Sequence, residues 1–256
     1  MSFALSKESA NAMGAEVISE QRNAGVSETR HGLPRGAEAV IAFLGLILIA
    51  PLMALTGLAI AVSSGRPVFF RQRRVGQHGR IFELYKLRTM KSSVDGPQIT
   101  SGNDARITRL GRFLRHTKLD ELPTLWNVLC GDMSLVGPRP EVPRFVNLED
   151  PIWHKVLSAR PGITDPVTLV LRSEADLLAK IEGDTERYYV QELQPAKLEG
   201  YVAYLNARTW RSDLRVLLWT IAAVVVPRQA NRLSPDEVGA MGQPESEFQA
   251  RLKPLE

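Results

Sequence analysis

Residues 39–62, AVIAFLGLILIAPLMALTGLAIAV, decide the fold class of this chain. They form a run of 24 positions without a charged side chain. A helix of that length can cover the roughly 30 Å of a bilayer's hydrocarbon core. A secretory signal peptide fits less well, because a polar stretch precedes the run and such peptides have only about 7–15 apolar residues. We therefore expect the segment to stay in a membrane.

The centre and the flanks of this run bear on its topology. Pro51 lies at the centre, and a proline inside a helix removes one backbone hydrogen bond and bends the helix. Basic flanks tend to stay cytoplasmic, so basic residues on both sides indicate that both ends emerge on one face. These residues are Arg22, Arg30 and Arg35 before the run and Arg66, Arg71, Arg73, Arg74 and Arg80 after it. A spanning helix with a tolerated proline is the alternative on these grounds.

The remaining composition predicts one further domain in a reducing compartment. About 190 residues follow Arg66, enough for one catalytic domain with a modest core. Cys130 is the only cysteine, which excludes an internal disulfide, and no Cys/His zinc spacing occurs. The formal charge is +4, but basic residues gather between Arg71 and Arg115. Such a cluster indicates anionic partners, and a solvated basic face is the simpler alternative.

A hairpin and two helices are predicted after the apolar run. Short strands are expected at 67–70 and 81–87, joined by a glycine-assisted turn at 75–79. A basic amphipathic helix at 106–115 either lies on the membrane surface or packs its apolar side on the core. The next helix, at 120–130, has an unbroken apolar stripe.

Proline and apolar patterns predict the last third of the chain. Residues 160–166 read as a rigid loop, because two prolines bracket it. The apolar run 216–226 is too short to span a bilayer, so it packs on the domain or lies in the membrane interface. Helical stretches are expected at 173–182, 185–192 and 195–208.

Two adjacent carboxylates, Asp120 and Glu121, begin the predicted helix, with Pro123 in its first turn. The positive end of a helix dipole favours anions, so a carboxylate there should stay ionised and a phosphate can dock nearby. An ionised Asp can attack phosphorus, and a neighbouring Glu can hold Mg²⁺. Taken alone, the pair is more simply a favourable helix cap.

Longer sequence motifs around this pair favour the catalytic interpretation over a simple helix cap. Residues 67–90 read PVFFRQRRVGQHGRIFELYKLRTM, residues 118–141 read KLDELPTLWNVLCGDMSLVGPRPE, and residues 160–164 read RPGIT. Together with the proline-centred apolar run, these strings resemble the bacterial sugar transferase family, the monotopic phosphoglycosyl transferases that initiate surface glycan assembly. The resemblance is strong from Pro34 to Thr164 and weaker to about Val226.

The resemblance implies a role for individual residues. Asp120 matches the nucleophile that attacks the β-phosphate of a nucleotide diphosphate sugar, and Glu121 matches the Mg²⁺-binding member of the dyad. Arg139 matches the arginine of a Pro-Arg-Pro turn that contacts the nucleotide, and its planar fork suits phosphate or a pyrimidine edge. The expected substrate-binding residues are Lys86 and Arg88 at the diphosphate, Arg139, Arg160 as a weaker contact, and Asp132, which orients its loop.

The implied fold is α+β, a mainly helical monotopic membrane protein with a re-entrant N-terminal membrane helix, a small β-hairpin and interfacial amphipathic helices. The expected divisions are a disordered polar tail at 1–33, the re-entrant helix at 34–66, a cytoplasmic phosphoglycosyl transferase domain at 67–228 and a polar tail at 229–256.

The implied reaction moves a sugar-1-phosphate from a UDP-sugar to polyprenyl (undecaprenyl) phosphate through a covalent aspartyl intermediate. It would initiate exopolysaccharide, capsule, O-antigen or glycoprotein glycan assembly. The expected cofactor is Mg²⁺, and the other partners are lipids of the bacterial inner membrane, with the catalytic domain facing the cytoplasm. No nucleic acid is expected, and the oligomeric state stays open, a homodimer included.

Two departures from the family pattern matter. Ala50 stands before Pro51 where many relatives have serine, and Asp165 follows RPGIT where many have glycine. The first departure removes a hydroxyl that could donate a hydrogen bond to the carbonyl freed by Pro51. The second leaves the identity of the transferred sugar undetermined. An acceptor phosphate at head-group level nevertheless favours the re-entrant form over the spanning one.

Two alternatives lack this catalysis. One is a membrane-tethered basic module that binds anionic lipid or nucleic acid, which should show interleaved aromatic residues and no buried acidic dyad. The other is a catalytically silent scaffold of the same fold. The aromatic residues near the basic cluster are predicted to belong to a core instead, namely Phe69, Phe70, Phe82, Tyr85 and Phe113.

Overall fold

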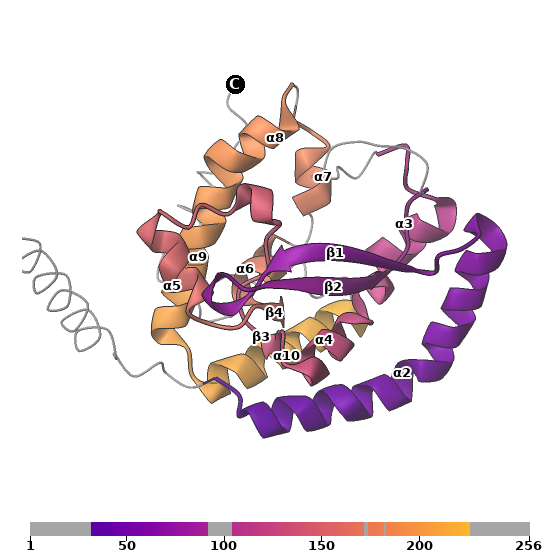
Figure 1. The fold of residues 1–256 in the computed structure, drawn as a ribbon, viewed down its shortest axis with the longest axis horizontal. Helices are drawn as coiled ribbons and strands as arrows, with labels where there is room; N and C mark the ends of the chain where they lie inside the picture. Colours follow the sequence, from indigo (N-terminus) through magenta and orange to yellow (C-terminus); the bar gives the residue numbers. More distant parts are fainter. Residues whose placement is uncertain (1–31, 92–103, 172–173, 182, 226–256) are drawn as a thin grey trace, which may run out of the picture.

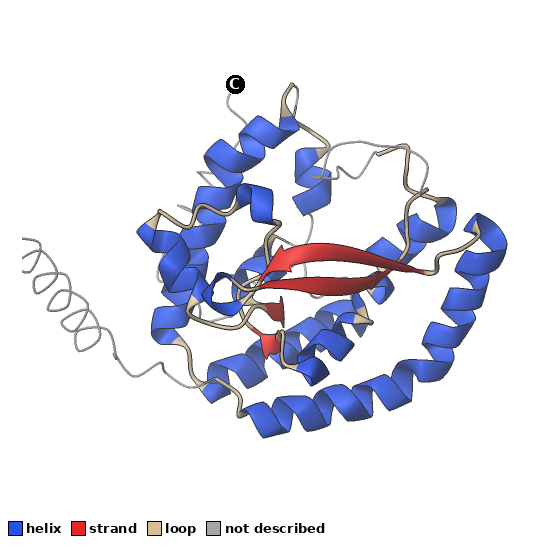
Figure 2. Cartoon of the chain, viewed as in Figure 1, coloured by secondary structure: helices blue, strands red, loops and turns tan. Residues whose placement is uncertain are grey.

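The computed structural model describes residues 32–91, 104–171, 174–181 and 183–225 (Figure 1). The described chain is mainly helical, with two small two-stranded sheets (Figure 2). The tail predicted at 229–256 lies outside the described residues, as does the tail predicted at 1–33 apart from its last two positions.

A β-hairpin crosses the middle of the molecule (Figure 1). Strands β1 (Phe69–Val75) and β2 (Ile81–Leu87) pair antiparallel, and a 3-10 turn (Gln77–Gly79) joins them. The prediction for β2 is confirmed. The first strand was predicted too early, because β1 runs through the basic residues 71–74, whose side chains can reach water from an exposed ribbon.

Part of the aromatic core prediction is wrong. Phe69 and Phe70 are each 46 % exposed and Phe113 is 57 % exposed. Phe82 is partly buried and packs against a core cluster, as predicted. Phe69 and Phe70 are consecutive on β1 and point to opposite faces of a two-stranded hairpin, so neither face is fully covered at this end.

Two helices follow the hairpin. Helix α3 (Arg109–His116) begins at Thr108, whose hydroxyl accepts a hydrogen bond from the Gly111 amide at 2.9 Å. The helix predicted at 120–130 is two elements, a 3-10 turn (Leu119–Glu121) and helix α4 (Thr124–Cys130). Helix α4 ends at Gly131, which adopts the left-handed conformation with φ of 95°.

The loop predicted at 160–166 is in fact ordered secondary structure. Strand β4 (Gly162–Thr164) pairs parallel with β3 (Ser134–Val136), and Asp165 then caps helix α6 (Pro166–Val170) by accepting from the Thr168 amide at 2.8 Å. The aspartate that departs from the family pattern is therefore an N-cap with proline directly after it.

Short helices and two longer ones complete the domain, namely α5 (Pro151–Leu157), α7 (Glu174–Leu178), α8 (Thr185–Tyr188), a π-helical turn (Tyr189–Leu193), α9 (Gln194–Ala207) and α10 (Trp210–Val225). One face of α10 packs on the core through Val216 and Ala223. The opposite face exposes a stripe of large apolar side chains, namely Trp210, Leu214, Leu218, Ile221 and Val224. The expected packing of this apolar run on the domain is confirmed, and its contact with a membrane interface stays a prediction.

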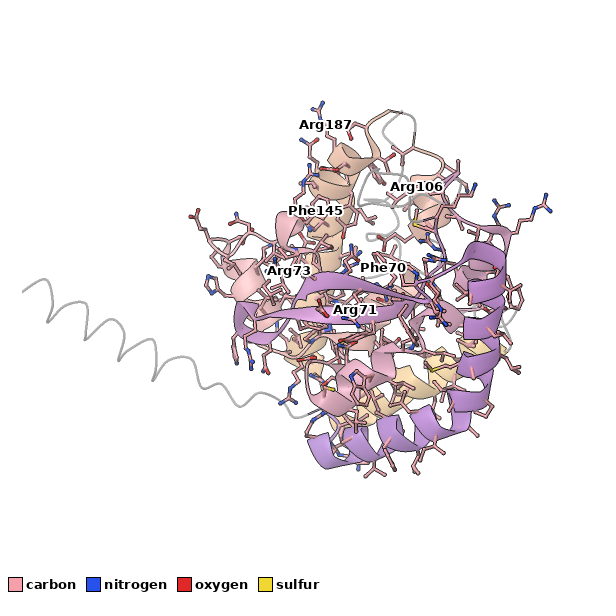
Figure 3. The ribbon with its side chains drawn as sticks, turned by 45° about the vertical axis from the view of Figure 1, so that its right-hand side comes forward. Phe70, Arg71, Arg73, Arg106, Phe145 and Arg187 are labelled. Carbon is pink, nitrogen blue, oxygen red and sulfur yellow. The ribbon has the colours of Figure 1, made fainter. Side chains whose placement is uncertain are left out.

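Helix α2 (Arg35–Ser64) contains the apolar run and Pro51. Figure 1 shows it bent into two arms that wrap around α4 and α10. Besides the proline, Thr56 donates its hydroxyl to the Leu52 carbonyl at 2.8 Å, a contact that also favours bending. Among the described residues, α2 alone is long and apolar enough to cross a membrane, and only 6 % of its apolar window is buried. Figure 3 shows its side chains standing out from the domain.

Both ends of α2 are fastened to the domain. At the first turn, Arg35 donates to the Val128 and Leu129 carbonyls at the end of α4, and Glu38, only 1 % exposed, accepts from the Leu135 amide at 3.0 Å. At the last turn, Arg88 donates to the Ser64 carbonyl at 2.6 Å. These contacts hold the two ends of the apolar helix α2 at a fixed place against the domain.

Candidate active site

Asp120 and Glu121 lie on the 3-10 turn that precedes α4. Lys118 enters this turn in the left-handed conformation with φ of 59°, and Pro123 has no amide to continue a helix. The regular helix therefore starts four residues later than predicted, at Thr124. Neighbouring side chains, more than a helix dipole, must then control the charge of the dyad.

Two cations hold the Glu121 carboxylate. Lys86 Nζ, on β2, donates to Glu121 Oε1 at 2.7 Å. Arg139 contacts both oxygens, with Nη1 at 3.3 Å from Oε2. Burial raises the pKa of Glu121, but Arg139 and Lys86 outweigh burial and hold this pKa well below its usual value. Glu121 is therefore a charged anchor that gathers two cations.

Asp120 has a different environment from its neighbour. It is 7 % exposed, and its Oδ1 atom is buried without a hydrogen-bond partner among the described residues. Burial and the charge of Glu121 raise the pKa of Asp120, while Lys86, Arg115 and Lys118 oppose that rise. A buried carboxylate oxygen without a donor is more basic and less shielded than an ordinary one, which suits a nucleophile.

Arg115 is a site residue that the sequence reading treated only as part of a basic helix face. Its Nε donates to Thr89 Oγ1 at 2.9 Å, and its charge acts on Asp120. Burial lowers the pKa of Arg115, and Asp120 opposes that change. The dyad thus has cations on two sides, Lys86 and Arg139 around Glu121 and Arg115 toward α3.

The Gly-Pro-Arg-Pro turn that carries Arg139 is braced by the RPGIT segment. The Gly162 amide donates to the Pro138 carbonyl at 3.0 Å, and the Gly137 amide donates to Thr164 at 3.0 Å. A methyl group at Gly137 would collide with the Arg160 carbonyl. On the other side, Arg74 Nη1 donates to the Pro140 carbonyl at 2.9 Å. Arg139 therefore projects from a stiff support.

Three predicted binding residues do not touch Glu121 in this structure. Arg88 contacts the end of α2, as described above. Asp132 is exposed at the far end of α4, with Oδ2 at 3.5 Å from the Asn127 amide. Arg160 is half-buried, and its backbone packs against Gly137. Their direct contact with substrate stays a prediction.

A polar network that the sequence reading missed adjoins Arg139. Tyr189 donates to Glu141, and Lys197 Nζ contacts both the Tyr189 hydroxyl at 3.4 Å and Glu174 at 3.0 Å. The Tyr201 hydroxyl is buried without a hydrogen-bond partner among the described residues, and burial raises its pKa well above the usual value. These residues come from segments too distant in sequence to show a local pattern.

Comparison with known proteins identifies the family. The model of the bacterial sugar transferase family matches residues 29–227, which include every described helix and strand. The chain belongs to the bacterial sugar transferase family. It is therefore a transferase, the enzyme class that the motifs predicted.

Several curated proteins are similar to this sugar transferase. A UDP-glucose:undecaprenyl-phosphate glucose-1-phosphate transferase of Caulobacter vibrioides is 36 % identical over 201 residues, 77 % of this chain and 71 % of the relative. A UDP-N-acetylgalactosamine-undecaprenyl-phosphate N-acetylgalactosaminephosphotransferase of Aeromonas hydrophila is 40 % identical over 62 % of this chain and 39 % of the relative. An Escherichia coli K12 protein with the same name as the Caulobacter one is 40 % identical over 60 % of this chain and 34 % of the relative. This sugar transferase thus spans well under half of the last two.

The donor atoms of the site fit a divalent cation only in part. Among the described residues of this sugar transferase, no group of three or more His, Cys, Asp or Glu side chains is arranged to hold a metal ion. The dyad offers the unpartnered Asp120 oxygen and Glu121, whose oxygens already face two cations. Mg²⁺ is commonly held by one or two carboxylates with substrate phosphates and water, so the dyad fits such an ion when a diphosphate supplies the other oxygens.

Proposed function

We propose that this sugar transferase moves a sugar-1-phosphate from a UDP-sugar to undecaprenyl or another polyprenyl phosphate. The observation that carries the proposal is the contrast within the dyad: Asp120 has a buried oxygen without a partner, while Glu121 gathers Lys86 and Arg139. The printed names of the Caulobacter and Aeromonas relatives support the two substrates. The names differ in the sugar, so they leave the sugar of this chain open.

In the first step, an Asp120 carboxylate oxygen attacks the β-phosphorus of the UDP-sugar. An O–P bond forms to Asp120, and the bond between that phosphorus and the oxygen bridging to the α-phosphate breaks. UMP leaves with the bonding electron pair, and the sugar phosphate stays on Asp120. The raised pKa of Asp120 supports this role, because a more basic carboxylate is a better nucleophile.

In the second step, an oxygen of the polyprenyl phosphate attacks the same phosphorus. The new O–P bond forms as the bond to Asp120 breaks, which restores the carboxylate and yields a polyprenyl diphosphate sugar. No proton has to move in either step. Each step builds negative charge around phosphorus, so catalysis depends on positioned cations.

Lys86, Arg139 and Arg115 supply these cations. Lys86 and Arg139 meet at Glu121, and their side chains are 18 % and 29 % exposed, so they can reach the donor diphosphate. Arg115, on α3, donates to Thr89 and its charge acts on Asp120, so it is the proposed partner of the acceptor phosphate. Mg²⁺, held by Glu121 and the diphosphate, would neutralise charge on the leaving phosphate.

We further propose that α2 is re-entrant and that the reaction takes place at the cytoplasmic face of the bacterial inner membrane. The exposed apolar residues of α2 and the exposed stripe of α10 give a surface suited to lipid. The bend around Pro51 and the basic flanks support entry and return on one face. Product release there would initiate assembly of a polysaccharide or other surface glycan.

The non-catalytic basic module fits less well. It gives no role to a buried acidic residue, whereas Asp120 is 7 % exposed and interacts electrostatically with Glu121 and Lys86. Exposed Phe69, Phe70 and Phe113 do favour a surface that meets lipid, and this is compatible with the enzyme.

The function is tested by incubating the purified protein in nanodiscs with polyprenyl phosphate, Mg²⁺ and a panel of UDP-sugars. The expected result is UMP release with one of the sugars and, without acceptor, a labelled protein. Asp120→Asn should lower transfer by more than about a thousandfold. Asp150→Asn, which keeps a helix cap at the distant α5, is the matched control. Full transfer by Asp120→Asn would overturn the nucleophile assignment.

A further inference from the structure

Asn127 lies in the middle of α4 and is fully buried, with 0 % exposure. Its side-chain amide makes two hydrogen bonds to the backbone of β2. Nδ2 donates to the Glu83 carbonyl at 2.7 Å, and Oδ1 accepts from the Tyr85 amide at 3.1 Å. A third strand would normally satisfy this edge of the hairpin. The Asn127 amide replaces one peptide group of such a strand.

This contact bears on the active site because both partners carry site residues. Lys86 follows Tyr85 directly on β2, and Glu121 lies on the turn just before α4. Side chains alternate along a strand, so Leu84 and Lys86 point to the same face. Leu84 is buried in one cluster with Val128 of α4, and Lys86 reaches Glu121.

Apolar packing alone does not fix how far β2 slides along α4, because hydrophobic contacts are not directional. Hydrogen bonds are directional, and the two made by Asn127 grip β2 on both sides of Leu84. A slide of one ångström would stretch them and would lengthen the 2.7 Å contact between Lys86 and Glu121.

We propose that Asn127 is a positioning residue of the transferase, which holds β2 in register so that Lys86 meets the dyad. Asn127 touches neither the substrate nor the reacting atoms and acts through Lys86. The kinetic test of this inference, kcat/KM for UMP release, rests on the proposed function. The measurement of UDP affinity does not depend on turnover.

The test is a double-mutant cycle with Asn127→Ala and Lys86→Met, measured as kcat/KM for UMP release and as UDP affinity without metal. Asn127→Ala should lower kcat/KM by about 10- to 100-fold. In the Lys86→Met background the same substitution should have an effect of less than about threefold, because the residue it positions is gone. UDP affinity should likewise change on Asn127→Ala when Lys86 is present and change by less than about threefold in the Lys86→Met background.

Gln194→Ala provides the matched control. Gln194 is also a buried amide that donates to a backbone carbonyl, that of Phe145 at 2.9 Å, but it lies on α9. Gln194→Ala should lower the unfolding temperature, as Asn127→Ala does. Any change that Gln194→Ala makes in kcat/KM should be the same with Lys86 present and in the Lys86→Met background. Equal effects of Asn127→Ala in both backgrounds would overturn the inference.

Asn127→Asp covers the case in which the alanine variant fails to fold. The carboxylate keeps the acceptor for Tyr85 but cannot donate to Glu83, whereas a protonated carboxyl can. The variant should therefore regain activity relative to wild type as the pH falls, and a parallel pH profile of the two proteins would count against the inference. Absence of UMP release by the wild type with every UDP-sugar would instead refute the proposed function, and the UDP affinities would still decide the role of Asn127.

Discussion

Lys86 Nζ lies 2.7 Å from Glu121 Oε1, although the two residues are 35 positions apart in sequence. Arg139 meets the same carboxylate, so Glu121 occupies the two cations that a diphosphate would need. In the proposed reaction, the donor diphosphate would therefore compete with the Glu121 carboxylate for Lys86 and Arg139.

Removing the Glu121 charge should release the two cations. Glu121→Gln is expected to bind UDP about tenfold more tightly than wild type in the presence of a chelator, because Lys86 and Arg139 no longer have a competing anion. Isothermal titration calorimetry in detergent measures this directly. Glu83→Gln, which alters an exposed ion pair, is the control. Unchanged or weaker UDP binding by Glu121→Gln would show that the carboxylate does not compete.

The raised pKa of Asp120 predicts a pH-dependent stability. An acid whose pKa is higher in the folded than in the unfolded protein destabilises the fold when it is ionised, and this cost disappears as the pH falls through the raised pKa. Asp120→Asn should therefore unfold at a higher temperature than wild type at neutral pH, and the difference should shrink on acidification. Thermal unfolding followed by circular dichroism checks it. A difference that grows on acidification would mean that the pKa is lowered.

The buried end of α2 should contribute measurably to stability. Glu38→Gln keeps the size of the side chain but removes the charge and one acceptor of the hydrogen bonds from Leu135 and Ser134. Burial raises the pKa of Glu38, so removal of its charge offsets part of the loss of hydrogen bonding, and we expect the free energy of unfolding to fall by about 1–2 kcal/mol. The comparison is Glu83→Gln, whose loosely paired carboxylate should contribute less than about 1 kcal/mol. Equal losses for the two variants would contradict the anchoring role.

The topology of α2 can be tested with single cysteines. Cys130 is exposed and serves as a natural reporter for the face on which the domain lies. In a Cys130→Ser background, cysteines at Ala39 and Ser63 should react with an impermeant maleimide from that same face. Labelling from opposite faces would establish a spanning helix and refute the re-entrant proposal.

The sequence was most informative where function and local pattern coincide. Strand β2 could be predicted, because alternation along a strand is a local signal. The adjacent carboxylates Asp120 and Glu121 alone suggested only a helix cap, and their proposed role came from the resemblance of the surrounding strings to a family. The pairing of β3 with β4 could not be predicted, since three-residue strands have no measurable period and their contact joins distant segments.

Buried polar residues were the hardest to interpret. Asn127 is buried in α4 together with Thr124 and Val128, whereas Trp126, which belongs to the predicted apolar stripe, is 50 % exposed. The sequence pattern therefore gave no sign of the β2 backbone groups that the Asn127 amide meets. Arg115 was read as one of several surface arginines, and only the position of α3 turns it toward Asp120. Both roles arise from packing between elements, which no single segment encodes.

The anchors of α2 have a consequence for biosynthesis. Arg35 is fastened to a carbonyl 93 residues further along the chain, and Glu38 to an amide 97 residues further. At a translation rate of about 5–20 residues per second, several seconds separate synthesis of the apolar helix from synthesis of its partners. The contacts that fix the first turn of the helix therefore cannot form while the helix itself is being synthesised. Its final placement is completed only after most of the transferase has emerged from the ribosome.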